Sequence, residues 1–185
     1  MADLEIPQVV AARAGVAVDS WSTGCAFGDY DGDGWLDLYV ASYVEFDVQN
    51  PPPSPARRQV SPADAAPQTA GGMGAAYSAG AAYCSYRGLP VMCGPRGLRG
   101  AADHLFRNNR DGTFTDTTQA AGVIDTRGLY GFGVAWFDFD DDSRLDLLVA
   151  NDSGPNYVYR NLGQGRLQNI SYPSGAALDG IVLAT

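Results

Sequence analysis

Short apolar runs alternate with polar turns along most of the chain. Two of these runs, Leu36–Ala41 and Leu145–Ala150, are rich in leucine, valine and tyrosine, and each is broken by one aspartate. Both are too short for ordinary helices and are bounded by turn-forming residues, so they predict buried β-strands. Small and aromatic residues precede each run, as GCAFG and GVAWF, and predict a partner strand before each turn.

The pattern repeats along the sequence. The segment Leu105–Asn108 matches Val158–Asn161 at an offset of 53 residues, and an Ala-Gly-Val turn ending at Val16 recurs at Val123. One repeat then contains about four short strands, which is the composition of a β-propeller blade. The sequence therefore predicts an all-β protein made of four-stranded antiparallel blades, a partial propeller of about two blades with a long insertion.

The repeat boundaries predict five segments. Residues 1–44 form the first part of the first blade, 45–101 the insertion, 102–121 the end of the first blade and the start of the next, 122–166 the second blade, and 167–185 the start of a third. The insertion contains three consecutive prolines at 51–53 and continues rich in Ala, Gly, Pro and Ser. Such sequence buries little apolar surface, so we expect 49–80 to be a long, partly ordered loop and 83–98 to be ordered.

Charge is concentrated in two places. The 185-residue chain has a formal net charge of −9, which argues against a nucleic-acid partner. Its 21 acidic residues are 19 Asp and 2 Glu, and nine of the Asp lie in the windows 29–37 and 138–146. Without these nine the formal charge would be zero. Concentrated Asp is typical of metal-binding loops or tight turns. No apolar stretch approaches the roughly 18 residues that a membrane span needs.

The spacing within the two windows favours the metal-binding interpretation over a solvated Asp-rich turn. Loop positions 1, 3, 5 and 9 are occupied by Asp29, Asp31, Asp33 and Asp37 in the first window and by Asp138, Asp140, Asp142 and Asp146 in the second. The backbone carbonyl oxygens of Trp35 and Arg144, at position 7, can add a ligand each. Calcium takes six to eight oxygen ligands, so we predict two calcium sites.

The two calcium loops are not expected to be equal, and neither is an EF-hand. Gly34 permits a sharp curl at position 6, whereas the second loop has Ser143 there and an additional acid, Asp141, so we expect the second site to be weaker. An EF-hand needs a glutamate at position 12 and flanking helices. Here position 12 is Val40 or Val149, within a predicted strand.

Catalytic signals are sparse. His104 is the only histidine, and we assign it a structural role. The alternative is a hydrolase or lyase site in a central channel, for which His104, Tyr83, Tyr86 and Arg96 are the candidates, but these residues form no recognisable motif. We therefore predict a protein that is not an enzyme.

The three cysteines have separate expected roles. Cys84 and Cys93, nine residues apart in the insertion, are expected to form a disulfide, with free thiols as the alternative. Zinc is disfavoured because no histidine or third cysteine lies near them in sequence. Cys25 lies in an apolar strand and is expected to be a buried free thiol.

These motifs resemble a known family. GCAFGDYDGDGWLDLYVASY and GFGVAWFDFDDDSRLDLLVAND resemble the FG-GAP/VCBS repeats of integrin-α-type propellers, and YCSYRGLPVMCGPRGL with HLFRNNRDGTFTDTTQAAGV resembles bacterial proteins of the ASPIC/UnbV, cartilage acidic protein-like family. The resemblance implies a seven-bladed propeller that is extracellular, periplasmic or on the cell surface. It also implies calcium bound by the eight aspartates above. Because calcium would make the blades rigid, and the loops and the insertion offer a recognition surface, we expect a non-catalytic role in adhesion or in binding a protein or carbohydrate.

The chain is too short for a seven-bladed propeller. Two blades cannot close a ring, so we expect the remaining blades to be missing from this chain and its outer faces to be sticky or to pair with another copy. The first ten residues carry no basic or apolar segment typical of a signal peptide.

Overall fold

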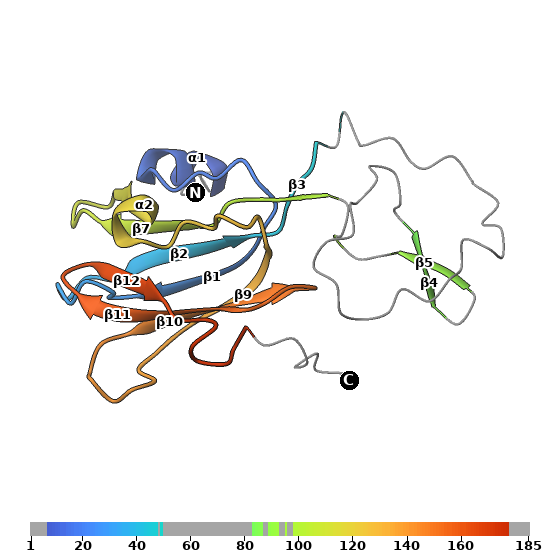
Figure 1. Cartoon of the computed structure of the whole chain (residues 1–185). Coiled ribbons are helices and arrows are strands. Elements are labelled where there is room, and N and C mark those ends of the chain that lie inside the picture. The colour runs from blue at the N-terminus through green and yellow to red at the C-terminus, as the bar shows by residue number, and fades with distance from the viewer. Residues whose placement is uncertain are drawn as a thin grey trace.

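The computed structural model describes residues 7–47, 49, 83–86, 89–92, 95 and 98–177. Two four-stranded antiparallel sheets make up its body (Figure 1). The first has the order β1-β2-β7-β8, with β1 Ser22–Gly28, β2 Asp37–Ser42, β7 His104–Asn108 and β8 Phe114–Asp116. The second has the order β12-β11-β10-β9, with β9 Tyr130–Phe137, β10 Asp146–Asp152, β11 Tyr157–Gly163 and β12 Arg166–Asn169. The prediction of four-stranded antiparallel units is confirmed.

The two sheets share the same register. Leu38 pairs with Phe106 between β2 and β7, and the equivalent Leu147 pairs with Tyr159 between β10 and β11. Register in a half-buried sheet is fixed by which side chains face the core, because a slip of one residue would turn every side chain over. The sequence repeat is therefore a repeat of strand pairing, and equivalent residues of the two sheets can be compared directly.

A short helix precedes each sheet, where the sequence predicts only a turn. Helix α1 (Pro7–Ala14) ends before Gly15 and α2 (Thr118–Ala121) before Gly122, and both glycines have positive φ, +76° and +84°. A glycine in this left-handed conformation is a common helix terminator. A third turn of this kind follows β12 and contains Gly175 at φ +82°. Four residues of α2 are too few to show a helical period, which is why the sequence did not predict it.

The main core lies between the two sheets. Its fully buried side chains include Tyr39 and Leu105 from the first sheet and Leu147, Val149 and Tyr159 from the second. A smaller cluster covers the opposite face of the first sheet and consists of Leu38, Val40 and Phe106 with Val16, Val18 and Phe114 packed against it. In the described part of the chain, no helix has the length and apolar character needed to cross a membrane.

Trp136 on β9 joins the sheets at the end near the acidic loops. Its ring stacks on Tyr30 at 6.4 Å between centroids, meets Tyr39 edge-on at 6.5 Å, and its Nε1 donates to the carbonyl oxygen of Ala26 at 3.2 Å. The ring also lies against the Cα of Gly28, where a Cβ would come within 2.7 Å of it. The glycine is thus required by the close approach of the indole.

Cys25 is a free thiol, as predicted, but it is exposed and not buried. Side chains alternate along β1, so Ala26 faces the second sheet while Cys25 and Phe27 face away from it. Phe27 on that outward side is 57% exposed. The apolar composition of the strand predicted burial, but the cluster under Val16 and Val18 does not extend over this edge of the sheet.

The insertion begins and ends on a short ribbon in which β3 (Val44–Glu45) pairs with β6 (Arg99–Gly100). Within it, β4 (Tyr83–Tyr86) and β5 (Leu89–Met92) form an antiparallel pair. The expected loop at 49–80 lies outside the described residues except for residue 49. The side chains of Cys84 and Cys93 also lie outside them, so the disulfide stays a prediction.

Asp103 is a carboxylate buried at the sheet interface, with only 3% of its surface exposed. Its Oδ1 accepts from the backbone N–H of Ser42 at 2.7 Å and its Oδ2 from the hydroxyl of Tyr39 at 3.0 Å. Burial outweighs these two hydrogen bonds and raises the pKa of Asp103 to about 6. The folded protein therefore holds a proton on this group that the unfolded chain releases at lower pH.

The first prediction concerns the contact between Gly28 and Trp136. Gly28→Ala should lower the free energy of unfolding by about 1–3 kcal/mol, because the added methyl group overlaps the indole ring. Gly133→Ala on β9 is the matched control, since its Cβ would lie 3.7 Å from that of Ala150 in ordinary contact. Urea denaturation measures both, and equal effects of the two substitutions would contradict the packing described here.

The second prediction concerns Asp103 and pH. Below the ordinary aspartate pKa of 3.8 both the folded and the unfolded state hold the proton, and the stabilisation present there is lost as the pH rises from that value through about 6. Relative to Asp103→Asn, the wild type should therefore lose about 2 kcal/mol of unfolding free energy between pH 4.5 and 7. Denaturant titrations of both proteins at the two pH values test this, and a difference that does not change with pH would refute it.

Candidate metal centre

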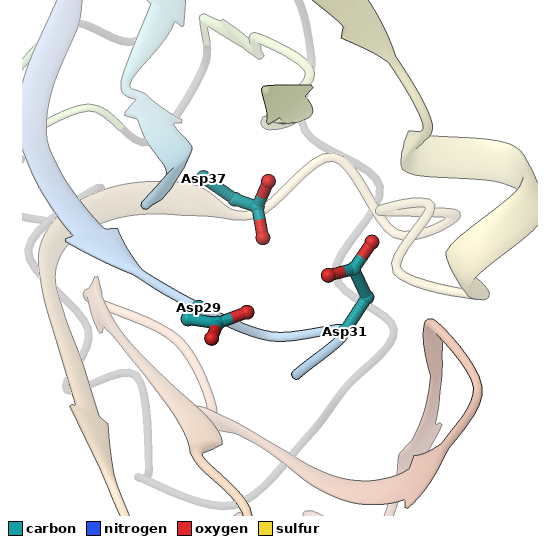
Figure 2. Close-up of side chains that lie close together, drawn as sticks. All are labelled: Asp29, Asp31 and Asp37. Carbon is teal, nitrogen blue, oxygen red and sulfur yellow. The ribbon is translucent and has the colours of Figure 1, made fainter. Parts of the chain in front are cut away.

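Three carboxylates converge in the loop between β1 and β2. Asp29 follows β1 directly, Asp31 lies in the loop, and Asp37 begins β2 (Figure 2). Each contributes one oxygen to a group in which all the contributed oxygens lie within 4.8 Å of one another. The structure thus brings together three of the four aspartates that the sequence predicted for this loop, hereafter loop 1 (residues 29–37).

Asp29 holds the backbone of loop 1 in its curl. Its Oδ1 accepts from the N–H groups of Gly32 at 2.8 Å and Asp33 at 3.0 Å, and its Oδ2 accepts from Gly34 at 2.8 Å. Gly32 and Gly34 have φ of +76° and +88°, so the chain turns twice through the left-handed region. The predicted role of Gly34 is confirmed, and Gly32 makes a second turn that was not foreseen.

Asp37 connects loop 1 to the third strand of the sheet. It is completely buried, and its Oδ1 accepts from the N–H of Asn108 at 2.8 Å while its Oδ2 accepts from that of Tyr30 at 3.2 Å. Burial, and after it the nearby carboxylates of Asp31 and Asp33, raise the pKa of Asp37 to about 6 against the lowering effect of the two hydrogen bonds. The pKa of Asp31 is also raised, first by burial and then by Asp33. These groups therefore lie where a positive charge would be favourable.

The loop between β9 and β10, hereafter loop 2 (residues 138–146), repeats this architecture. Asp138 accepts from the N–H groups of Asp142 at 3.1 Å and Ser143 at 2.8 Å. Asp146 is completely buried and accepts from Asn161 at 2.7 Å and Phe139 at 3.1 Å, as Asp37 does from its equivalents. The carboxylates that converge within 4.8 Å are those of Asp138, Asp140 and Asp142.

Loop 2 reaches the same backbone conformation without glycine. Asp141 and Ser143 have φ of +58° and +66°, at the positions that Gly32 and Gly34 occupy in loop 1. A non-glycine residue in this region is strained by about 1–2 kcal/mol. Ser143 therefore does not prevent the curl, but loop 2 folds at a cost that loop 1 avoids.

Two predicted ligands lie outside these clusters. Asp33 is turned toward Arg110, whose Nη2 and Nε lie 2.6 and 3.2 Å from its Oδ2. Asp146 has both oxygens occupied by backbone N–H groups. At position 7, the N–H groups of Trp35 and Arg144 donate to Asp33 and Asp142. That the carbonyl oxygens of these two residues bind calcium stays a prediction.

Sequence reasoning missed the arginines and asparagines around the loops. Arg160 lies 2.5 Å from Asp140, and Arg144 pairs with Asp142. The buried Asn161 donates from its Nδ2 to the carbonyl oxygens of Tyr30 and Leu145, both at 2.8 Å, and so bridges the two loops. The repeated Arg-Asn pair was visible in the sequence and could have indicated this role, since Asn108 and Asn161 occupy equivalent positions.

Asp140 retains one unsatisfied atom. Its Oδ1 is inaccessible to solvent and has no hydrogen-bond partner within the described residues. A buried acceptor without a partner is unfavourable, and a cation is one kind of partner that would satisfy it.

His104 lies away from both clusters. Its Nδ1 is 2.8 Å from Asp116, and its ring stacks on Phe106 at 5.6 Å, so it is built into the first sheet. The side chains of Tyr83 and Tyr86, as well as Arg96, fall outside the described residues, and the structure therefore does not test the alternative catalytic set.

Known proteins share the repeat. A family model described as an FG-GAP-like repeat matches residues 96–149 and 138–184. Residues 96–184 carry FG-GAP-like repeats. It is 39% identical over 72 residues to cartilage acidic protein 1 of Mus musculus and of Homo sapiens, and 36% identical over 70 residues to that of Xenopus tropicalis.

These matches support the family suspected from the sequence. The segments cover 37% of this chain for the mouse and human proteins and 36% for the frog protein, but only 11% of each relative. The chain therefore matches about a tenth of the length of these relatives. The first sheet extends the repeat beyond the family match, because its strands follow the register of the second.

The third prediction exchanges the residues at position 6. Ser143→Gly should raise the free energy of unfolding by about 0.5–1 kcal/mol, because glycine adopts the positive φ without strain. Gly34→Ser should lower it by a similar amount. Both changes keep the N–H donor to the first aspartate, so chemical denaturation reports the backbone conformation. Opposite signs are expected, and two changes of equal sign would contradict the assignment.

Proposed function

We propose that this chain belongs to a calcium-stabilised, non-catalytic repeat module that acts outside the cytoplasm and binds a protein or carbohydrate. The observation that carries the proposal is the recurrence, in the same register, of two curled loops that each gather three carboxylates. An isolated acidic turn occurs often without a metal. Two that share their hydrogen bonds, the second of them within a segment that matches an FG-GAP-like repeat, favour a common ligand.

The donor atoms fit a hard divalent cation. The proposed ligands are the four aspartates of each loop with the carbonyl oxygens of Trp35 and Arg144, all oxygen donors of the kind calcium prefers. The loops contain no histidine or cysteine, so they lack the donors that select zinc. In each loop the first aspartate orders the backbone and the last fixes the loop to the sheet, leaving the middle positions to complete the coordination.

The electrostatics point in the same direction. Burial and mutual repulsion raise the pKa values of Asp31 and Asp37, so their ionised forms are destabilised as the protein stands. Asp140 has a buried oxygen that finds no hydrogen-bond partner in the described part of the chain. A bound divalent cation would stabilise the ionised carboxylates and satisfy that oxygen.

An extracytoplasmic location suits such sites. Calcium-binding modules that act outside cells commonly have dissociation constants of about 0.1–1 mM, which match the calcium available there. The similarity to cartilage acidic protein 1 agrees with a location outside the cell. Calcium present at ten times its dissociation constant would raise the unfolding free energy by about 1.4 kcal/mol per site.

The proposed binding role is supported by exposed aromatic side chains. Trp21, Trp35 and Tyr172 are each about half exposed, at 50%, 48% and 51%. Aromatic rings with one polar atom are frequent in recognition surfaces, because they add contact area at little conformational cost. His104 is engaged with Asp116 and stacked on Phe106, an arrangement that supports a structural role.

The fourth prediction is that calcium stabilises the fold. Metal-free protein titrated with CaCl₂ in a calorimeter should show binding, and its melting temperature should rise on calcium addition and fall again with excess chelator. The double variant Asp31→Asn with Asp140→Asn should lose most of both effects, because one converging carboxylate is removed from each loop.

Asp19→Asn is the matched control, since Asp19 is an exposed aspartate outside both loops. It changes the net charge by one unit and should leave the calcium response unaltered. A wild-type protein whose melting temperature and heat of titration do not respond to calcium would refute the proposed function.

A further inference from the structure

Arg110 reaches from the hairpin between β7 and β8 into loop 1. Its Nη2 and Nε donate to Oδ2 of Asp33 at 2.6 and 3.2 Å, while Oδ1 of Asp33 accepts from the N–H of Trp35 at 2.9 Å. Both oxygens of Asp33 are therefore engaged. The other three aspartates of the loop converge, and Asp33 is the one that does not join them.

The backbone of Arg110 is strained in order to hold this position. It has φ of +67°, in the left-handed region that arginine rarely adopts. The equivalent residue of the second sheet is Gly163, with φ of +76°. The two N–H groups make the same bond, to Oδ1 of Asn108 and of Asn161, both at 2.8 Å. Glycine therefore suffices for the turn, and the arginine needs another explanation.

The second sheet shows the arrangement without an arginine at this hairpin position. There Asp142, the equivalent of Asp33, lies within the converging group. It does so although Arg144 pairs with it and Arg160 lies 4.0 Å away. Asp33 thus lies outside the converging group in the sheet that has Arg110, whereas Asp142 lies inside it in the sheet where Gly163 takes that position.

We propose that Arg110 and the bound cation compete for Asp33, so that Arg110 sets the affinity of loop 1. This inference rests on the proposed function, because it assumes that loop 1 binds a divalent cation. Binding of the cation to Asp33 must break the forked ion pair between Arg110 and Asp33. It also places the divalent cation near the positive charge of Arg110. In a partly exposed loop, a unit charge several ångströms from a divalent ion changes its affinity by about tenfold.

The test is a calorimetric titration of the full chain with CaCl₂. All proteins carry Asp140→Asn, which disables loop 2 and makes loop 1 the site observed. Arg110→Gly and Arg110→Gln should both bind calcium about 3- to 30-fold more tightly than the parent. The glycine variant keeps the hairpin free of strain, so tighter calcium binding by this variant cannot come from a damaged fold.

Arg99→Gln is the charge-matched control. Arg99 pairs with Glu45 at 3.3 Å on the β3–β6 ribbon, at the opposite end of β2 from loop 1. Its removal lowers the net charge by one unit, as the Arg110 substitutions do, and should change the dissociation constant for calcium less than twofold. An equal effect of Arg99→Gln would show that overall charge, and not the pair with Asp33, determines the affinity.

The remaining outcomes decide between the two proposals. Calcium binding that is equally tight in all Arg110 variants would overturn the competition and leave the proposed function intact. Tightening in Arg110→Gly alone would assign the effect to backbone strain and would also overturn it. Binding that appears only after Arg110 is replaced would support it, and no binding in any protein, including one with both loops intact, would remove both proposals.

Discussion

The architecture depends on one buried carboxylate per sheet. Asp37 and Asp146 each begin the second strand and accept two backbone hydrogen bonds, one from the preceding loop and one from the third strand. A buried charge without such partners would be costly, so the loop and the hairpin must both form for the aspartate to be tolerated. This interaction sets where the loop closes, and with it the place where the remaining carboxylates meet.

The sequence was most informative where chemistry and spacing coincide. The alternation of Asp in two windows predicted the loops, and the Leu-Val runs predicted the strands that follow them. The match between Leu105–Asn108 and Val158–Asn161 predicted the third strand, and the structure adds that its register is the same in both sheets. The calcium ligands themselves remain a proposal, since carboxylates in a tight turn are compatible with both a metal and solvent.

What sequence could not supply comes from contacts between residues far apart in the chain. The side chain of Arg110 is 77 residues from its partner Asp33, and no local pattern indicates that they meet. The exposure of Cys25 likewise depends on which face another element covers, and not on the apolar strand around it. Helix α2 is too short to show a helical period in the sequence, and only the glycine that ends it is recognisable there.

Asn161 couples the two loops through hydrogen bonds to both of them. One amide group donates to a carbonyl of each loop, while the N–H of the same residue holds the buried aspartate of the second. Any local opening that withdraws β11 therefore releases both loops together, so they belong to a single cooperative unit of the native-state ensemble. Motion confined to one loop is correspondingly disfavoured, because it would break one of the two hydrogen bonds that the amide of Asn161 donates.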